Sequence, residues 1–268
     1  MYYLSLPHIL WMKKRQLLAL AGGTISGFFA GELFGLDKAP HIHLFHGNFL
    51  QKEFLVCLLL GAVAGTVTPL LSWKHSPGLP AMAFSLIISC FGLTAAGNDF
   101  ETIGEMDRMI SYVFDSLVIL MGYLTTYIFA WITDTQVVFR SLPVRPEAKK
   151  ANLRETLIKM IPCSILTTLG GVIVGFIMPV CGAISISVSF ALASFFSSYV
   201  FRVRSTLWYS LSGPFYLSIA GSLAFSRADL LSLFFSANWF QNYPAYLVCG
   251  AGSSGAILGH WIWLMKQR

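Results

Sequence analysis

Long stretches with almost no charge decide what this chain can fold into. Eight of them run for 18 to 24 residues with at most one Asp, Glu, Lys or Arg each: 16–36, 53–73, 80–97, 109–132, 158–179, 181–201, 205–225 and 245–264. A membrane-spanning helix needs about 20 apolar residues, and only 11% of the chain is charged, against about 25% in soluble domains. The sequence therefore predicts an all-α, polytopic integral membrane protein with about eight transmembrane helices in a single domain over residues 1–268.

The basic residues test this topology, because cytoplasmic loops are enriched in Lys and Arg. With a cytoplasmic N-terminus, fourteen of the eighteen basic residues lie on the cytoplasmic side: Lys13, Lys14, Arg15, Lys74, Arg140, Arg145, Lys149, Lys150, Arg154, Lys159, Arg202, Arg204, Lys266 and Arg268. We therefore expect both termini in the cytoplasm and the chain in a cell inner (plasma) membrane. This orientation accounts for the net charge of +6, so no nucleic-acid partner is expected.

Three segments outside the spans have distinct compositions. Residues 1–15 are predicted to form a cytoplasmic N-terminal segment, and residues 133–157 a basic cytoplasmic loop. The basic stretch 143–159 suits either a topology signal at anionic lipid or a docking site for a cytoplasmic partner. Residues 226–244 are too apolar for a free loop and too interrupted for a ninth span. They are predicted to form an outer helix that lies at the interface or re-enters the membrane.

Glycine and proline recur at four-residue spacing. The sequence GAVAGTVTP at 61–69 has the same Gly and Pro spacing as GVIVGFIMP at 171–179, in spans of opposite direction. Either spans 2–4 and 5–7 form an inverted repeat, as in many transporters, or two helices pack tightly and independently. Because proline removes a helical hydrogen bond, three residues are predicted helix breaks: Pro69, Pro179 and Pro214.

Small residues also form rows along two other spans. Such rows let helices approach closely, so a compact, glycine-rich bundle is expected. The rows are Gly23, Gly27, Gly31 and Gly35 in the first span, and Ala251, Gly255 and Gly259 in the last.

Two carboxylates lie clearly inside predicted spans, away from their ends: Glu32 and Asp115. A charge in the membrane is costly and commonly functional. The outer connection before the fourth span adds Asp99 and Glu101, and concentrated negative charge attracts cations. These four residues are predicted to bind or couple a substrate or ion. The alternative is that Glu32 only reaches toward the interface and that Asp115 is structural.

The first outer loop contains a cluster of metal-ligand residue types. Its sequence DKAPHIHLFH supplies Asp37, His41, His43 and His46. Imidazole and carboxylate groups at this spacing suit zinc, copper or nickel, although the interleaved apolar residues equally suit a segment resting at lipid headgroups. A divalent metal at this loop is one hypothesis, and no other cofactor is expected.

The last span contains Gly252-Ser253-Ser254-Gly255, which over four residues resembles the G-x-S-G motif of rhomboid-type intramembrane serine proteases. That resemblance implies a serine nucleophile paired with a histidine on a later helix. Here His260 follows on the same helix, rotated by about 120° and displaced by about 9 Å from Ser254. The pair cannot form the activating hydrogen bond, so no catalytic residue is predicted. His260 is expected in the interfacial aromatic belt or, alternatively, at an inner gate.

The leading functional hypothesis is a transporter, permease or channel for a small solute, with a cation or a proton-coupled substrate, rather than an enzyme. Besides lipid and solute, a homo-oligomer or protein partner is consistent with the sequence. One alternative is a non-catalytic membrane subunit for assembly, signalling or defence that acts through a protein partner. The other is an intramembrane enzyme acting on a lipid-linked substrate.

Overall fold

A computed structural model describes residues 14, 17–27, 29, 49–72, 78–95, 105–133, 162–163, 165–170, 182–202, 207–215 and 245–266. No strand occurs among these residues. The labelled helices are α2 (Phe49–Ser72), α3 (Leu79–Ala95), α4 (Glu105–Thr133), α6 (Gly182–Phe201), α7 (Leu207–Ser210) and α11 (Ala245–Lys266). A further apolar helix covers Leu17–Gly27.

Three helices are long and apolar enough to cross a membrane: Asp115–Thr133 in α4, Ile184–Phe201 in α6 and Tyr246–Leu264 in α11. Shorter apolar helices at Leu17–Gly27, Phe54–Leu70 and Leu79–Gly92 coincide with three more predicted spans. The predicted spans 158–179 and 205–225 are described only at 162–163, 165–170 and 207–215. The all-helical class is confirmed for the described residues, and the count of eight spans and the orientation of the termini stay predictions. Apart from Lys14 and Thr133, the segments 1–15, 133–157 and 226–244 lie outside the described residues.

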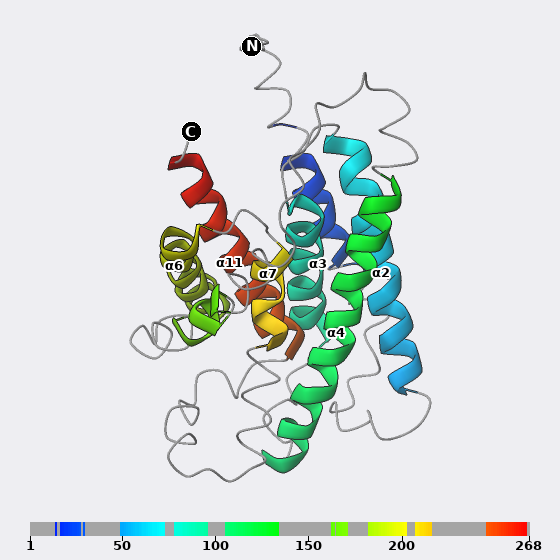
Figure 1. Cartoon of the computed structure of the whole chain (residues 1–268). Coiled ribbons are helices and arrows are strands. Elements are labelled where there is room, and N and C mark those ends of the chain that lie inside the picture. The colour runs from blue at the N-terminus through cyan, green and yellow to red at the C-terminus, as the bar shows by residue number, and fades with distance from the viewer. Residues whose placement is uncertain are drawn as a thin grey trace.

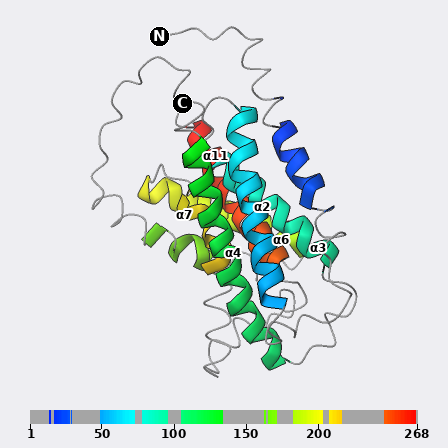
Figure 2. The same cartoon turned by 90° about the vertical axis from the view of Figure 1, so that its right-hand side faces the viewer.

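Helix α11 lies at the centre of the described helices (Figures 1 and 2). It packs most extensively against α6 on one side and α3 on the other, while α2 and α4 form a second closely packed pair. Of its candidate span, 78% is buried, compared with 39% for α4 and 44% for α6. Protein therefore surrounds α11, whereas α4 and α6 each keep an outward face.

Helix α6 exposes a row of apolar side chains and buries its serine hydroxyl groups, together with the apolar residues Ile186 and Phe190. The exposed row consists of Ile184, Val188, Leu192 and Phe196, and the buried polar set of Ser185, Ser189, Ser194, Ser197 and Ser198. This is the reverse of a helix on a soluble protein, whose apolar face points to the core. It suits lipid on one side and interhelical hydrogen bonds on the other.

The small-residue face of α11 lies directly against α6. The Ser187 hydroxyl of α6 donates to the Ala251 carbonyl at 3.0 Å. A Cβ atom added at Gly255 would overlap the Ser187 carbonyl oxygen, and one added at Gly259 would overlap the Ala191 carbonyl oxygen. The two backbones are therefore in contact, and any side chain at these glycines would push the helices apart.

The other glycine rows are described in part. Gly61 and Gly65 of α2 pack against backbone carbonyls of α4, and Gly27 packs against the backbone of α3. The rest of these patterns lies outside the described residues: Gly31, Gly35 and 171–179. The inverted repeat therefore stays a prediction, because its second half is among them.

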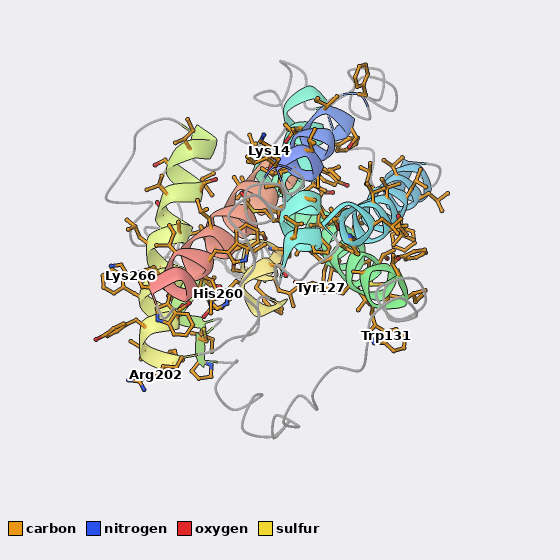
Figure 3. All side chains as sticks on the ribbon, turned by 90° about the horizontal axis from the view of Figure 1, so that it is seen from above. Lys14, Tyr127, Trp131, Arg202, His260 and Lys266 are labelled. Carbon is orange, nitrogen blue, oxygen red and sulfur yellow. The ribbon has the colours of Figure 1, made fainter. Side chains whose placement is uncertain are left out.

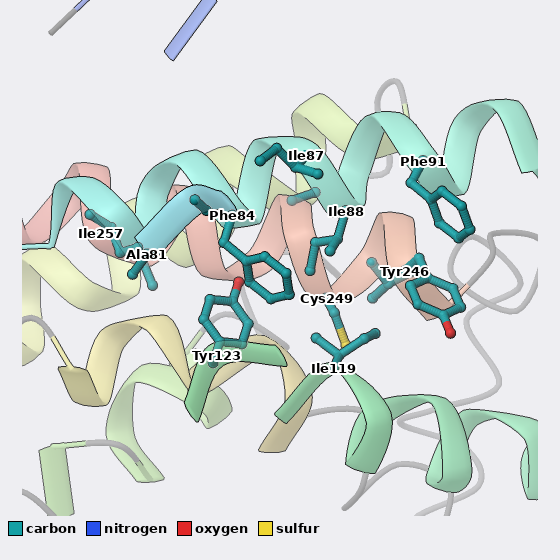
Figure 4. Packing of buried hydrophobic residues seen from close by; sticks show 14 of the residues in the cluster. Ala81, Phe84, Ile87, Ile88, Phe91, Ile119, Tyr123, Tyr246, Cys249 and Ile257 are labelled. Carbon is teal, nitrogen blue, oxygen red and sulfur yellow. The ribbon is translucent and has the colours of Figure 1, made fainter. Parts of the chain in front are cut away.

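Buried apolar side chains fill the space where α3, α4 and α11 meet (Figure 4). Phe84 of α3 meets Tyr123 of α4 edge to face, with ring centroids 4.8 Å apart. Ile119 and Cys249 belong to the same fully buried cluster. Because lipid tails are as apolar as this core, close van der Waals packing is what stabilises it in a bilayer.

Helix α6 ends in a left-handed residue. Arg202 has a φ of 51°, and its N–H donates to the Ser198 carbonyl at 2.9 Å. This closes the helix with an αL C-cap, a position that glycine adopts more easily than arginine. The arginine in return places a positive charge at the negative end of the helix dipole.

Candidate functional site

Asp115 is buried within α4, with 5% of its surface exposed. It lies ten residues after the first residue of α4, or about 15 Å along the helix axis. The Cys57 thiol of α2 donates to the Val118 carbonyl of α4 at 3.5 Å, one turn along from Asp115, and Cys57 belongs to the same buried cluster as Cys249 of α11. A carboxylate from one helix thus shares the interior with thiols from two others. The predicted role of Asp115 in binding or coupling an ion stays a prediction.

The other predicted coupling and metal residues lie outside the described residues: Glu32, Asp99, Glu101, Asp37, His41, His43 and His46. Across the described helices, no group of three or more His, Cys, Asp or Glu side chains is arranged to hold a metal ion. The metal hypothesis for the outer loop is therefore not tested.

Pro214 coincides with a break in the helical structure, as predicted. Helix α7 ends at Ser210, a turn follows at Leu211, and helical backbone resumes at 212–215. Proline has no N–H, so the residue four positions earlier loses its usual helical donor. That residue is Ser210, and its carbonyl accepts a hydrogen bond of 2.6 Å from the Ser253 hydroxyl of α11. A serine of the neighbouring helix thus occupies the position that the proline left open.

The other predicted breaks differ from Pro214. Pro69 lies inside α2, which continues as a helix to Ser72. The helix is therefore not interrupted at Pro69, contrary to the predicted break: the proline removes one backbone hydrogen bond, and α2 continues past it. Pro179 lies outside the described residues.

Tyrosine and serine side chains connect α3, α4 and α7. The Tyr123 hydroxyl lies 2.6 Å from the Ser85 hydroxyl of α3, and Ser85 donates its own proton to the Ala81 carbonyl at 2.7 Å. Tyr123 is therefore the donor to Ser85. Tyr127, one turn further along α4, lies 3.0 Å from the Ser210 hydroxyl of α7.

A second polar cluster surrounds His260 on the other side of α7. We name it the His260 cluster, and it comprises His260 of α11, Ser198 of α6, Tyr209 of α7 and Cys163, which lies in the helical pair 162–163. All four are fully or almost fully buried, with exposed fractions of 0% to 1%. The His260 ring stacks on Tyr209 with centroids 4.3 Å apart. Seen from above, His260 and Tyr127 lie on the two sides of α7 (Figure 3).

Hydrogen bonds join the four residues in one line. Ser198 lies 3.1 Å from Nδ1 of His260 and donates to the Tyr209 hydroxyl at 2.8 Å. The Tyr209 hydroxyl lies 3.0 Å from the Cys163 sulfur. A serine hydroxyl has a single proton, so His260 donates from Nδ1 to Ser198, while either the Tyr209 hydroxyl or the Cys163 thiol can be the donor of the bond between them.

The direction of these bonds argues against serine catalysis at the Ser198–His260 pair. A nucleophilic serine gives its proton to the histidine, whereas Ser198 gives its proton to Tyr209. The G-x-S-G serine is not paired with His260 either, because Ser254 donates to the Ala251 carbonyl of its own helix at 3.1 Å.

The burial of His260 differs from the sequence prediction. An interfacial belt residue would face the headgroups, but His260 is completely buried. The sequence placed a histidine near the end of an apolar span, which fits both positions. Its partners lie on helices 62 and 51 residues away along the chain, and only the packing of α6 and α7 against α11 reveals them.

Comparison with known proteins adds no assignment to this geometry. No protein-family model, curated protein or solved structure matches the chain.

Proposed function

We propose that the chain is a multi-pass inner-membrane transporter, permease or channel for a small solute, with a cation or a proton-coupled substrate. The observation that carries this proposal is Asp115, a carboxylate buried among helices in α4, which is apolar enough to cross a membrane. Burying a charge there is costly unless it binds a cation or takes up a proton. Asp115 is accordingly the coupling residue in this proposal.

The interrupted helix at α7 supports the same function. Transporters commonly build their substrate sites from discontinuous helices, because such helices offer backbone groups and can change shape. Here the interruption lies at Leu211, between the polar groups of α4 and those of α6 and α11. A shift of α7 would rearrange contacts on both of its sides at once.

The finer architecture belongs to the proposal as well. It comprises eight spans in a compact, glycine-rich bundle, both termini in the cytoplasm, and an acidic outer mouth formed by Glu32, Asp99 and Glu101. In this orientation Asp115 lies in the outer half of the fourth span, and His260 lies toward the cytoplasmic end of the last span. An ion or proton would pass from Asp115 to His260.

The experiment uses the purified full-length chain in liposomes. Proton flux is driven by a potassium diffusion potential and followed with a pH dye inside the vesicles, and uptake of Na⁺ and K⁺ is measured in parallel. The wild-type chain is expected to transport at least one of these ions. Asp115→Asn, which keeps the size of the side chain and removes the charge, is expected to reduce that flux to the level of empty liposomes.

Ser116→Ala is the matched control, because Ser116 is the adjacent buried residue of α4 and carries no charge. Its flux is expected to stay close to that of the wild type. Both variants must elute as folded protein with unchanged helical content. Wild-type flux that persists in Asp115→Asn would show that this carboxylate is not the coupling residue.

A further inference from the structure

We propose that the His260 cluster is a proton relay, in which two hydroxyl groups move one proton between the His260 ring and the Cys163 sulfur. This inference deepens the proposed function, on which it rests, because it names the proton as the coupling ion and adds a second site on the cytoplasmic side. His260 and Cys163 are the titratable ends, and Ser198 and Tyr209 carry the proton between them.

The geometry supplies an uninterrupted path. The three distances from Nδ1 of His260 through Ser198 and Tyr209 to Cys163 are 3.1, 2.8 and 3.0 Å. The Ser198 hydroxyl accepts from the His260 ring and donates to Tyr209, and all four side chains are buried. Within such a line a proton can move by small displacements without any side chain crossing a gap.

A second line of hydrogen-bonded hydroxyl groups, from Tyr123 through Ser85, ends on a different kind of acceptor. Tyr123 donates to Ser85, and Ser85 donates to the Ala81 carbonyl. A backbone carbonyl cannot take up a proton and pass it on at ordinary pH, so that line holds its protons in place. The His260 cluster ends instead on a thiol, which does exchange its proton. This difference makes the His260 cluster a relay and the Tyr123 line a structural contact.

The transfer balances in protons and charge. It begins with the His260 ring doubly protonated and Cys163 as a thiolate. The Nδ1 proton moves to the Ser198 oxygen, the Ser198 proton to the Tyr209 oxygen, and the Tyr209 proton to the sulfur. It ends with a neutral imidazole and a neutral thiol, both hydroxyls are restored, and no oxidation or reduction occurs.

The surroundings of His260 contain few other titratable groups among the described residues. Tyr209 of α7 stacks on the ring, α6 brings the hydroxyl of Ser198, and the indole of Trp263 stacks at a centroid distance of 5.7 Å. Lys266, on the same helix, is directed to the Phe195 ring at 5.3 Å. Proton transfer along the line therefore has Cys163 as its terminal acceptor within this cluster.

The test follows both ends of the relay in the full-length chain in lipid nanodiscs. Nitrogen NMR of ¹⁵N-histidine protein reports the His260 ring, with the signal assigned by loss in His260→Gln. Infrared spectroscopy reports the S–H stretch of Cys163, assigned by loss in Cys163→Ala. In the wild type we expect the two signals to change together during a pH titration.

Two variants interrupt the line at different points. Ser198→Ala removes one hydroxyl, and Tyr209→Phe removes the other while keeping the stacked ring. In each, the two signals are expected to titrate independently, and proton flux in liposomes is expected to fall by at least about tenfold. Tyr123→Phe, which removes a buried tyrosine hydroxyl outside the relay, is expected to leave the coupling of the two signals intact.

The two readouts separate this inference from the proposed function. Coupled signals without any transmembrane proton flux would support the relay and refute proton transport. Proton flux with independent signals in the wild type would overturn the relay and leave the transport proposal standing. If Ser198→Ala fails to fold, Tyr209→Phe decides the question alone.

Discussion

The hydrogen bond from Ser253 to the Ser210 carbonyl offers the sharpest test of how α7 is held. Ser253→Ala removes the hydroxyl and leaves the rest of α11 unchanged. The bond is 2.6 Å long, and both residues are fully buried. The usual helical donor for this carbonyl would be the N–H of residue 214, which proline lacks. We therefore expect the variant to be less stable, with the loss concentrated at the contact between α7 and α11.

Two kinds of measurement set the expected loss of stability in Ser253→Ala. Interhelical hydrogen bonds in membranes are worth about 0.6 kcal/mol on average and about 1.7 kcal/mol at most. Taking the partner from a buried polar group costs about 1–3 kcal/mol. Because the Ser210 carbonyl loses a short bond in a buried place, the expected loss lies where the two ranges meet, at about 1–2 kcal/mol. Ser254→Ala is the control, since Ser254 bonds only within its own helix turn, and its expected loss is below about 0.5 kcal/mol.

A double-mutant cycle makes the assay specific. Unfolding in mixed micelles with increasing SDS is followed by tryptophan fluorescence, for which the chain has seven tryptophans. Pro214→Ala restores an N–H that can donate to Ser210, so Ser253→Ala is expected to cost about 1 kcal/mol less in that background. The account of the break would be refuted if Ser253→Ala lost the same stability in the Pro214 and the Pro214→Ala backgrounds. It would also be refuted if Ser253→Ala and Ser254→Ala lost the same stability.

Two further predictions concern packing and burial. Gly255→Ala is expected to destabilise the chain by about 2 kcal/mol or more, measured by the same SDS titration, because the new methyl group meets the Ser187 carbonyl. The control is Gly22→Ala, where an added Cβ has no neighbour within 4 Å; an equal loss there would contradict the packing argument. In a Cys181→Ser background, a membrane-impermeant maleimide is expected to leave the folded chain unlabelled and to label the chain once SDS has unfolded it. Fast labelling of the folded chain would contradict the burial of its remaining thiols, Cys57, Cys90, Cys163 and Cys249.

The positions of the helices could largely be predicted from the sequence, whereas the side chains that hydrogen-bond to one another across helices could not. Apolar runs locate helices because the bilayer sets their length. The position of Asp115 within its run gave its depth, whereas its burial depends on how α4 is rotated about its axis. Helical rotation alone also showed that Ser254 and His260 do not pair. The partners Ser198 and Tyr209 of His260 depend on how three helices are rotated about their axes, and a pattern within one helix carries no information on that. Likewise, proline chemistry predicted the break at Pro214 but not the serine that satisfies it.

The reversed polarity of α6 has a consequence for how its sequence can vary. On its outward row, including Ile184 and Phe196, one apolar side chain can replace another at little cost, because fluid lipid adapts to any shape. On the side toward Gly255 and Gly259, the contact leaves no room for a larger residue. A saturation mutagenesis scan of α6 should therefore show tolerance that alternates with the helical period. Positions toward α11 should reject larger side chains, and positions on the outward row should reject polar ones.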